Sequence, residues 1–92
     1  MKTLSDLKRA MVKGSRWEAV HFNGTHLGIR EIVEVYTNKI GFFTDRGTVS
    51  YVYFPKAKDI NFNNGWVEFW REWYVSGSLE YIPILKYRQI EA

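Results

Sequence analysis

"FNNGWVEFWREWYVSG", residues 62–77, decides how this chain folds, because two different periodicities fit it. At the spacing of a helix (i, i+3, i+4, i+7 and i+8) the stretch has one continuous aromatic stripe, which consists of Trp66, Phe69, Trp70, Trp73 and Tyr74. At the spacing of a strand the same rings divide between the two faces of a sheet. The helix would be a packing element, whereas the strand would leave several rings outside the core.

The composition of the stretch and the residues before it favour the strand. Aromatic residues and valine are enriched in strands, and Asn64-Gly65 is the strongest short-range signal for a two-residue hairpin turn. Such a turn sets Phe62 opposite Val67 and Ile60 opposite Phe69. The predicted core face then consists of Ile60, Phe62, Val67, Phe69 and Trp73, and the other face of Trp66, Glu68, Trp70, Glu72 and Tyr74.

A second hairpin is predicted upstream, where Asn23-Gly24 has the same turn signal. As a two-residue turn it sets His21 opposite His26 and Val20 opposite Leu27. The strand that follows is long, so Gly28 is expected to host a β-bulge. This register predicts an apolar row on the core face, made of Val20, Leu27, Ile29, Val33 and Val35.

Two more turns and one proline predict where the remaining strands begin, end and pair. A turn at Asn38-Lys39 would place Val35 opposite Phe42. Residues 45–47, Asp-Arg-Gly, match a three-residue hairpin loop whose last residue is left-handed. Pro83 lacks a backbone N–H, so the final strand is expected at an edge of the sheet or kinked.

The first 14 residues predict a helix. Thr3 and Asp6 have the spacing of a capping pair, and Gly14 is placed as the glycine after the helix end. The apolar side is formed by Leu4, Leu7 and Met11. The fold class is therefore α+β and mainly β: one domain, residues 1–92, with a helix over 1–14. About six antiparallel strands follow over 15–90, in a meander that forms a small, partly open, SH3-like barrel.

Composition excludes several classes of protein. With 92 residues, there is room for one core, and the absence of cysteine excludes disulfides and thiolate metal sites. No signal-peptide pattern and no apolar run of membrane-spanning length is present, so a cytoplasmic protein is expected. The net charge of +3 arises from the first 16 residues, which hold five basic side chains and one acidic one. The rest is electrostatically mixed, which argues against a broad phosphate-binding surface.

No catalytic constellation is found, so the expectation is that the protein is not an enzyme and carries no cofactor or metal. His21 and His26 are the only side chains that titrate near neutral pH in the ordinary case. A pair of imidazoles would need a third ligand to hold zinc, and local spacing offers none. The serines and threonines have no base at a recognisable spacing, and the glycines do not form a phosphate loop.

The residues of the chain support a binding surface better than a catalytic site. Trp66, Trp70, Tyr74 and Glu68 on one strand face match the aromatic anchors and charged rim of a protein interface, which predicts a protein partner or self-association. The alternative is a single-stranded nucleic acid, stacked on the rings and contacted by basic residues, namely Lys56, Lys58, Lys8, Arg9 and Lys13. The third possibility is structural: the apolar side of the N-terminal helix covers these rings.

The segments "REIVEVYTNKIGFFTDRG" and "YFPKAKDINF", with the opening "LSDLKRAMVKG", resemble small uncharacterised proteins encoded by phages and prophages of Gram-positive bacteria. The resemblance implies a compact β-rich fold with an N-terminal helix. It carries no catalytic residues. By association, it also implies a modulator of host machinery that acts by binding protein.

Overall fold

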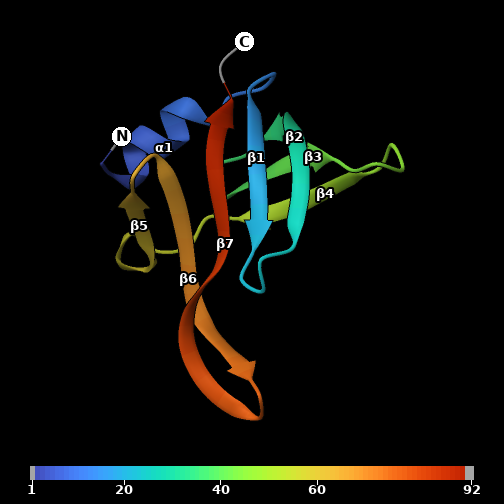
Figure 1. Cartoon of the computed structure of the whole chain (residues 1–92). Coiled ribbons are helices and arrows are strands. Elements are labelled where there is room, and N and C mark those ends of the chain that lie inside the picture. Colours follow the sequence, from blue (N-terminus) through green and yellow to red (C-terminus); the bar gives the residue numbers. More distant parts are fainter. Residues whose placement is uncertain (1, 91–92) are drawn as a thin grey trace.

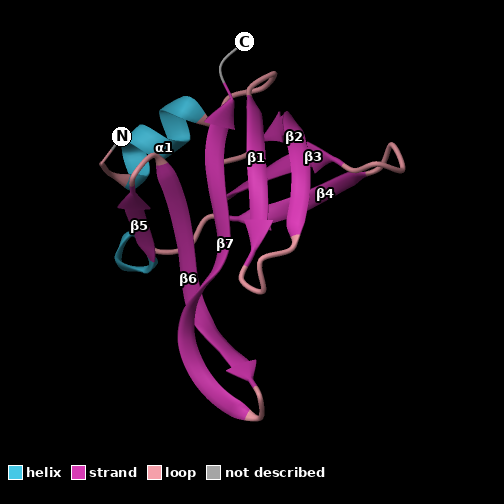
Figure 2. Ribbon diagram, in the orientation of Figure 1, coloured by secondary structure: helices cyan, strands magenta, loops and turns pink. Residues whose placement is uncertain are grey.

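The computed structural model describes residues 2–90, which form one antiparallel sheet and one short helix (Figures 1 and 2). The sheet has seven strands in the order β4-β3-β2-β1-β7-β6-β5. A mainly β fold with an N-terminal helix is thereby confirmed, with one strand more than the six expected. The elements are α1 (Leu4–Ala10), β1 (Arg16–His21), β2 (His26–Val35), β3 (Lys39–Phe43), β4 (Val49–Tyr53), the 3-10 turn η1 (Ala57–Asp59), β5 (Ile60–Asn63), β6 (Trp66–Val75) and β7 (Ser78–Ile90).

The sheet curls into a half-barrel whose two edges, β4 and β5, do not pair with each other. Strand β2 makes the curl possible, because residues 26–31 pair with β1 and residues 32–35 pair with β3. Register shifts lie in both halves, and such bulges bend a strand and increase its twist. As a result β3 and β4 pass behind β1 and β7 in Figure 1.

The core lies inside the curl and is closed by the helix. Leu7 of α1 and its C-cap residue Met11 are both fully buried among strand residues. The helix is also tied to the far side of the half-barrel, because the Lys8 ammonium donates to the Thr37 carbonyl over 2.9 Å. The strands contribute Trp17, Ala19, Ile32, Ile40, Phe42, Val67, Phe69 and Tyr87.

The helix begins as predicted and ends early. Thr3 and Asp6 form the complete capping box, which satisfies N–H groups that have no partner within the helix. The helix ends at Ala10 with Met11 as its C-cap, so the predicted span to residue 14 is wrong. Gly14 instead has φ of +90° and donates its N–H to the Ile32 carbonyl over 2.7 Å, which attaches the helix to β2.

The strand prediction for residues 66–74 and its register are confirmed. Phe62 lies opposite Val67 and Ile60 opposite Phe69. Asn64 and Gly65 have φ of 51° and 84°, as a type I′ turn requires at both central positions. The three-residue loop over 45–47 is confirmed too, because residue 44 pairs with residue 48 and the glycine at 47 has φ of +78°.

The register predicted around Asn23-Gly24 is wrong by one residue. The loop has three residues, 22–24, since the His21 N–H bonds to the Thr25 carbonyl, and Val20 pairs with His26. The expected bulge at Gly28 is confirmed: Ala19 pairs with Gly28, so that residue 27 is the extra one.

This bulge changes which side chains of β2 enter the core. A one-residue insertion reverses the alternation of a strand beyond it. Ile32 is therefore buried, whereas Ile29 and Val35, predicted for the core face, are exposed. The next turn is shifted as well: Tyr36 bonds to Lys39 across residues 37–38, and Val35 lies opposite Ile40 in place of Phe42. Among residues 2–90, no helix has the length and apolar character needed to cross a membrane.

Candidate protein interface

The hairpin of β6 and β7 extends well beyond the half-barrel as a two-stranded arm, formed by residues 70–83 (Figure 1). Pairing of β6 with β5 ends at Phe69, and pairing of β7 with β1 ends at Leu85. Within the described residues, the two strands of the arm therefore pair only with each other, from Trp70↔Pro83 to Val75↔Ser78. Both of its edges present unpaired backbone groups, which are a template for adding another strand.

A bulge separates the arm from the half-barrel. Phe69 pairs with Leu85 but Trp70 pairs with Pro83, so that Ile84 is the extra residue. The expected kink at Pro83 is thus found, but not the edge position, because β7 lies between β1 and β6. The missing N–H of Pro83 costs no sheet hydrogen bond to β1, because β1 ends before it. Figure 1 shows the two strands twisting around each other at this point.

Large apolar side chains of the arm lie in solvent. The exposed fractions are 40% for Trp73, 71% for Tyr74, 54% for Leu79 and 50% for Tyr81. Tyr74 and Leu79 are direct cross-strand partners, and the Arg71 guanidinium lies 5.1 Å from the centre of the Trp73 ring. The assignment of Trp73 to the core is therefore wrong. Its strand face continues the core face, but the core ends at the bulge.

Trp70 is half-buried and contacts Glu68 and Tyr81. Its indole N–H donates to Glu68 Oε1 over 3.2 Å, and its ring lies 5.3 Å from the ring of Tyr81. The Tyr81 hydroxyl donates to Asp59 Oδ1 over 2.7 Å, and this bond raises the pKa of Tyr81. The idea that the N-terminal helix covers these rings is wrong, since Leu7 and Met11 pack in the core, on the other side of the sheet.

Glu68 lies between Trp66 and Trp70 in the aromatic row, where it accepts hydrogen bonds from neighbouring side chains. Only 6% of its surface is exposed. The same oxygen, Oε1, accepts hydrogen bonds from the Asn61 amide over 2.8 Å and from Trp70. A buried carboxylate with such donors fixes the orientation of an indole ring. Glu68 thus supports the predicted surface from within and does not present its carboxylate to a partner.

Trp66 and Tyr74, both predicted to bind a partner, lie far apart. They are eight residues apart on one strand, which corresponds to roughly 26 Å at about 3.3 Å per residue. Trp66 is half-buried under the Arg88 guanidinium, whose carbon lies 4.7 Å from the ring centre. Arg88 in turn binds Glu18 over 2.6 Å. The predicted set is therefore a row along β6, and only its Trp70–Tyr74 half reaches the exposed arm.

A groove of about 450 Å³ opens beside Trp70, where the arm leaves the half-barrel. The end of β4 and the segment after it line the groove with Tyr53, Phe54 and Pro55. Trp70 and Arg71 line it from the base of the arm. The groove thus joins the base of the arm to the edge strand β4. It was not predicted, because its walls come from segments that are distant in the sequence.

The basic residues of the nucleic-acid alternative are dispersed or already bonded. Lys8 binds a backbone carbonyl and lies 5.4 Å from the centre of the Phe54 ring, and Arg9 pairs with Asp6. Lys56 and Lys58 are exposed in the connector before β5, and Lys13 is exposed after α1. Of the five, only Lys8 lies over an aromatic ring within residues 2–90, and that ring, Phe54, does not belong to the row on β6.

The two histidines do not face each other. His26 Nε2 lies 3.1 Å from Glu18 Oε2, and the His21 ring packs on Phe22 with centroids 4.5 Å apart. No cluster of three or more potential metal ligands occurs within residues 2–90.

No protein-family model, no curated protein and no solved structure matches the chain at a significant level.

Proposed function

We propose that this chain is a non-catalytic binding module that engages a protein partner through the β6–β7 arm. The observation that carries the proposal is the concentration of exposed rings and Leu79 on a hairpin with two free edges. Isolated two-stranded hairpins are at most marginally stable in water. An arm of this kind, with aromatic side chains in solvent, has the composition of an interface.

The arm offers two means of recognition. Its edges suit strand addition, in which backbone hydrogen bonds provide affinity and alternate side chains provide specificity. Tyr74 and Leu79 at the tip and Trp70 with Tyr81 at the base provide large apolar anchors. The row starting at Trp66 and held by Glu68 continues this surface into the half-barrel. SH3-like identity for the half-barrel and a role in modulating host machinery belong to the same proposal, the latter on the phage and prophage resemblance.

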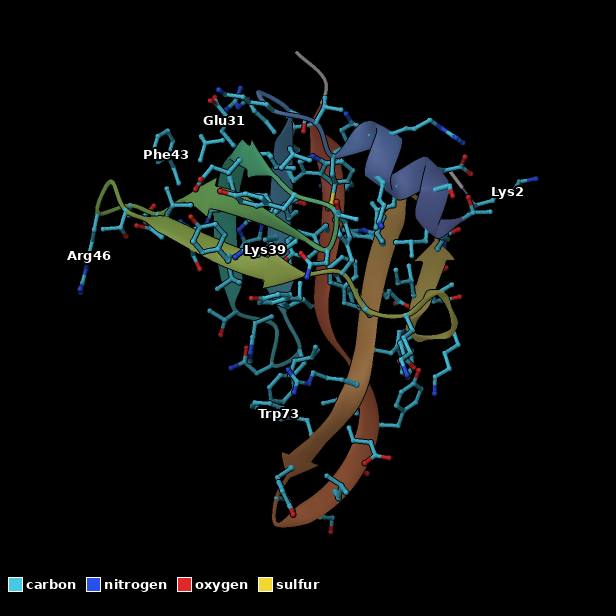
Figure 3. All side chains as sticks on the ribbon, turned by 180° about the vertical axis from the view of Figure 1, so that it is seen from behind. Lys2, Glu31, Lys39, Phe43, Arg46 and Trp73 are labelled. Carbon is cyan, nitrogen blue, oxygen red and sulfur yellow. The ribbon has the colours of Figure 1, made fainter. Side chains whose placement is uncertain are left out.

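Site-specific photo-crosslinking tests the arm as the contact surface. A photoreactive residue is placed at Tyr74 or Leu79 in the cells that encode the protein, and at Arg46 as the control. Arg46 is exposed at the tip of the β3–β4 loop, away from Trp73 (Figure 3). We expect the arm positions to capture the same protein and the control position to miss it. Adding Tyr74→Ser to the Leu79 probe, or Leu79→Ser to the Tyr74 probe, should abolish capture.

Light scattering of the purified protein separates self-association from a second protein. A dimer mass that reverts to a monomer mass in the Tyr74→Ser, Leu79→Ser variant identifies a second copy as the partner. A monomer mass together with an arm-specific crosslink identifies a different protein. A monomer that gives equal or no crosslinks from all three positions would overturn the proposal.

A further inference from the structure

A second cluster of aromatic side chains lies around Lys39 of β3, which is separated from Trp73 of the arm (Figure 3). Three tyrosines surround the ammonium group of Lys39. Its nitrogen lies 4.5 Å from the ring centre of Tyr51, 5.1 Å from that of Tyr36 and 5.6 Å from that of Tyr53. A cation within about 6 Å of an aromatic face is attracted by the quadrupole of the ring. One cation therefore interacts with three rings at once.

The cluster is held in place by an acidic side chain. Glu34 accepts hydrogen bonds from the Tyr36 hydroxyl over 2.8 Å and from the Tyr51 hydroxyl over 2.6 Å. These rings are 6.3 Å apart and inclined at 53°, so that they form two walls. The carboxylate also places a negative charge near the cation. Glu34 thus orients two of the rings and adds electrostatic attraction.

A glycine makes room for the third side of the cluster. Gly41 lies opposite Tyr51 on the neighbouring strand. A Cβ atom at this position would lie 3.2 Å from a Tyr51 ring carbon and 2.8 Å from a Val49 methyl group. The absence of a side chain lets the Tyr51 ring lie over the strand, and Tyr53 is placed directly across from Lys39.

The Lys39 side chain is bound only weakly in this site. No ion pair to its ammonium occurs among residues 2–90, and the tyrosine rings are open to solvent. A primary ammonium is strongly hydrated, so placing it against rings requires partial loss of water. An ammonium that carries methyl groups is less hydrated and adds apolar contact, and aromatic cages recognise such groups.

We propose that Tyr36, Tyr51 and Tyr53, with Glu34, form a binding site for a methylated ammonium group, and that the Lys39 side chain occupies this site in the free protein. The ligand displaces Lys39, which swings into solvent. The site uses no side chain of the arm, although Tyr51 and Tyr53 also line the groove at the base of the arm. Its partner is defined by chemistry: a quaternary ammonium, either free or on a methylated lysine of another protein.

Tetramethylammonium is the first probe, titrated against the full chain while the ring signals of the tyrosines are followed by NMR. Lys39→Ala removes the internal occupant. If Lys39 fills the site about nine-tenths of the time, its removal should strengthen binding about tenfold. Tyr53→Leu in the Lys39→Ala background should weaken binding, and Tyr53 is exposed enough for the fold to tolerate the change.

The matched control for Tyr53→Leu is Phe43→Leu, which removes another exposed ring of the same sheet, outside the cage (Figure 3). It should leave binding unchanged. Neopentyl alcohol, a neutral probe of similar shape, should not bind. The proposal is overturned if Lys39→Ala shows no shift of tyrosine ring signals with tetramethylammonium, if the neutral probe binds equally well, or if Phe43→Leu has the same effect as Tyr53→Leu.

Two further titrations of Lys39→Ala distinguish the source of the ligand. A trimethyllysine peptide that binds more tightly than its unmodified form and than choline indicates a methylated protein. Choline binding at least as tightly as the peptide indicates a small molecule.

Discussion

The half-barrel and the arm are built on the same two strands, yet apolar side chains are buried in the half-barrel and exposed in the arm. Before the bulge at Ile84, Val67 and Phe69 of β6 are buried against the core. Beyond it, Trp73 and Tyr74 of the same strand lie in solvent. The strand alternates throughout, but alternation buries a side chain only where a second layer covers that face. A high content of aromatic residues therefore predicts neither a core nor an interface by itself.

The two regions should first differ in the cost of losing a tryptophan. Trp17→Ala removes a fully buried side chain from the half-barrel, and we expect the free energy of unfolding to fall by about 3–5 kcal/mol. Trp73→Ala in the arm removes a cross-strand contact and should cost about 1 kcal/mol or less. Urea unfolding followed by circular dichroism measures both. Equal losses would show that the arm is part of the cooperative core.

The two regions should next differ in how much stability they lose when one carbon atom is added. Gly41→Ala introduces a Cβ that would lie 2.8 Å from Val49, so we expect a loss of about 1–3 kcal/mol. Ser78→Thr adds one methyl group at an exposed position of the arm and should change stability by no more than about 0.5 kcal/mol. Thermal unfolding of the two variants tests this. A Gly41→Ala protein as stable as the original would mean that Val49 and Tyr51 move aside freely.

Substitutions in the turns of the two hairpins should change stability by a smaller amount. Asn64-Gly65 in the half-barrel and Ser76-Gly77 at the tip of the arm both have positive φ at each central residue. Asparagine adopts this conformation more readily than serine. Ser76→Asn should stabilise the arm by a few tenths of a kcal/mol, up to about 1 kcal/mol.

Amide hydrogen exchange measures the turn effect. Protection should rise for residues 72–80 and stay constant in the core, because the arm opens separately from the half-barrel. The reverse swap, Asn64→Ser, should lower protection in β5. A uniform rise over the whole chain in Ser76→Asn would contradict a locally opening arm.

The last difference concerns the pH dependence of stability at the tyrosine cage. Its hydrogen bond to Glu34 raises the pKa of Tyr51 to about 12 and lowers the pKa of Glu34. An unfolded chain ionises tyrosine near pH 10. The stabilisation from the raised pKa is therefore complete below pH 10 and is lost as the pH rises through 12. The lowered pKa of Glu34 acts at the acid end, where its contribution is lost as the pH falls below the ordinary carboxyl range.

Glu34→Gln checks the cause of this shift. Titration of the Tyr51 ring signal should move from about 12 toward 10. Tyr81, whose pKa is raised by Asp59 at the base of the arm, is the internal control and should titrate as before. A Tyr51 titration that stays at 12 would assign the shift to burial.

Local chemistry in the sequence determined two of the turns, one bulge and the helix start, whereas the turns near Asn23 and Asn38 were each shifted by one residue. The capping box at Thr3 and Asp6, the type I′ turn at Asn64-Gly65, the loop over 45–47 and the bulge at Gly28 were all readable. Each depends on a few neighbouring residues whose backbone preferences are strong. The strand over residues 66–75 followed from the turn beside it, which fixed the register with β5.

Only the tertiary structure decided where the strands are covered. The bulge at Gly28 reversed the faces of β2, and the one at Ile84 separated the arm from the core. Trp73 is exposed because β1 and β5 are shorter than β6 and β7, so that no neighbouring strand supports the arm. Glu68 is buried because Asn61 and Trp70 close over it. Burial depends on contacts between segments that are distant in the sequence. The relative lengths of the strands and the positions of the bulges determine which side chains are covered, and the periodicity along one strand does not contain this information.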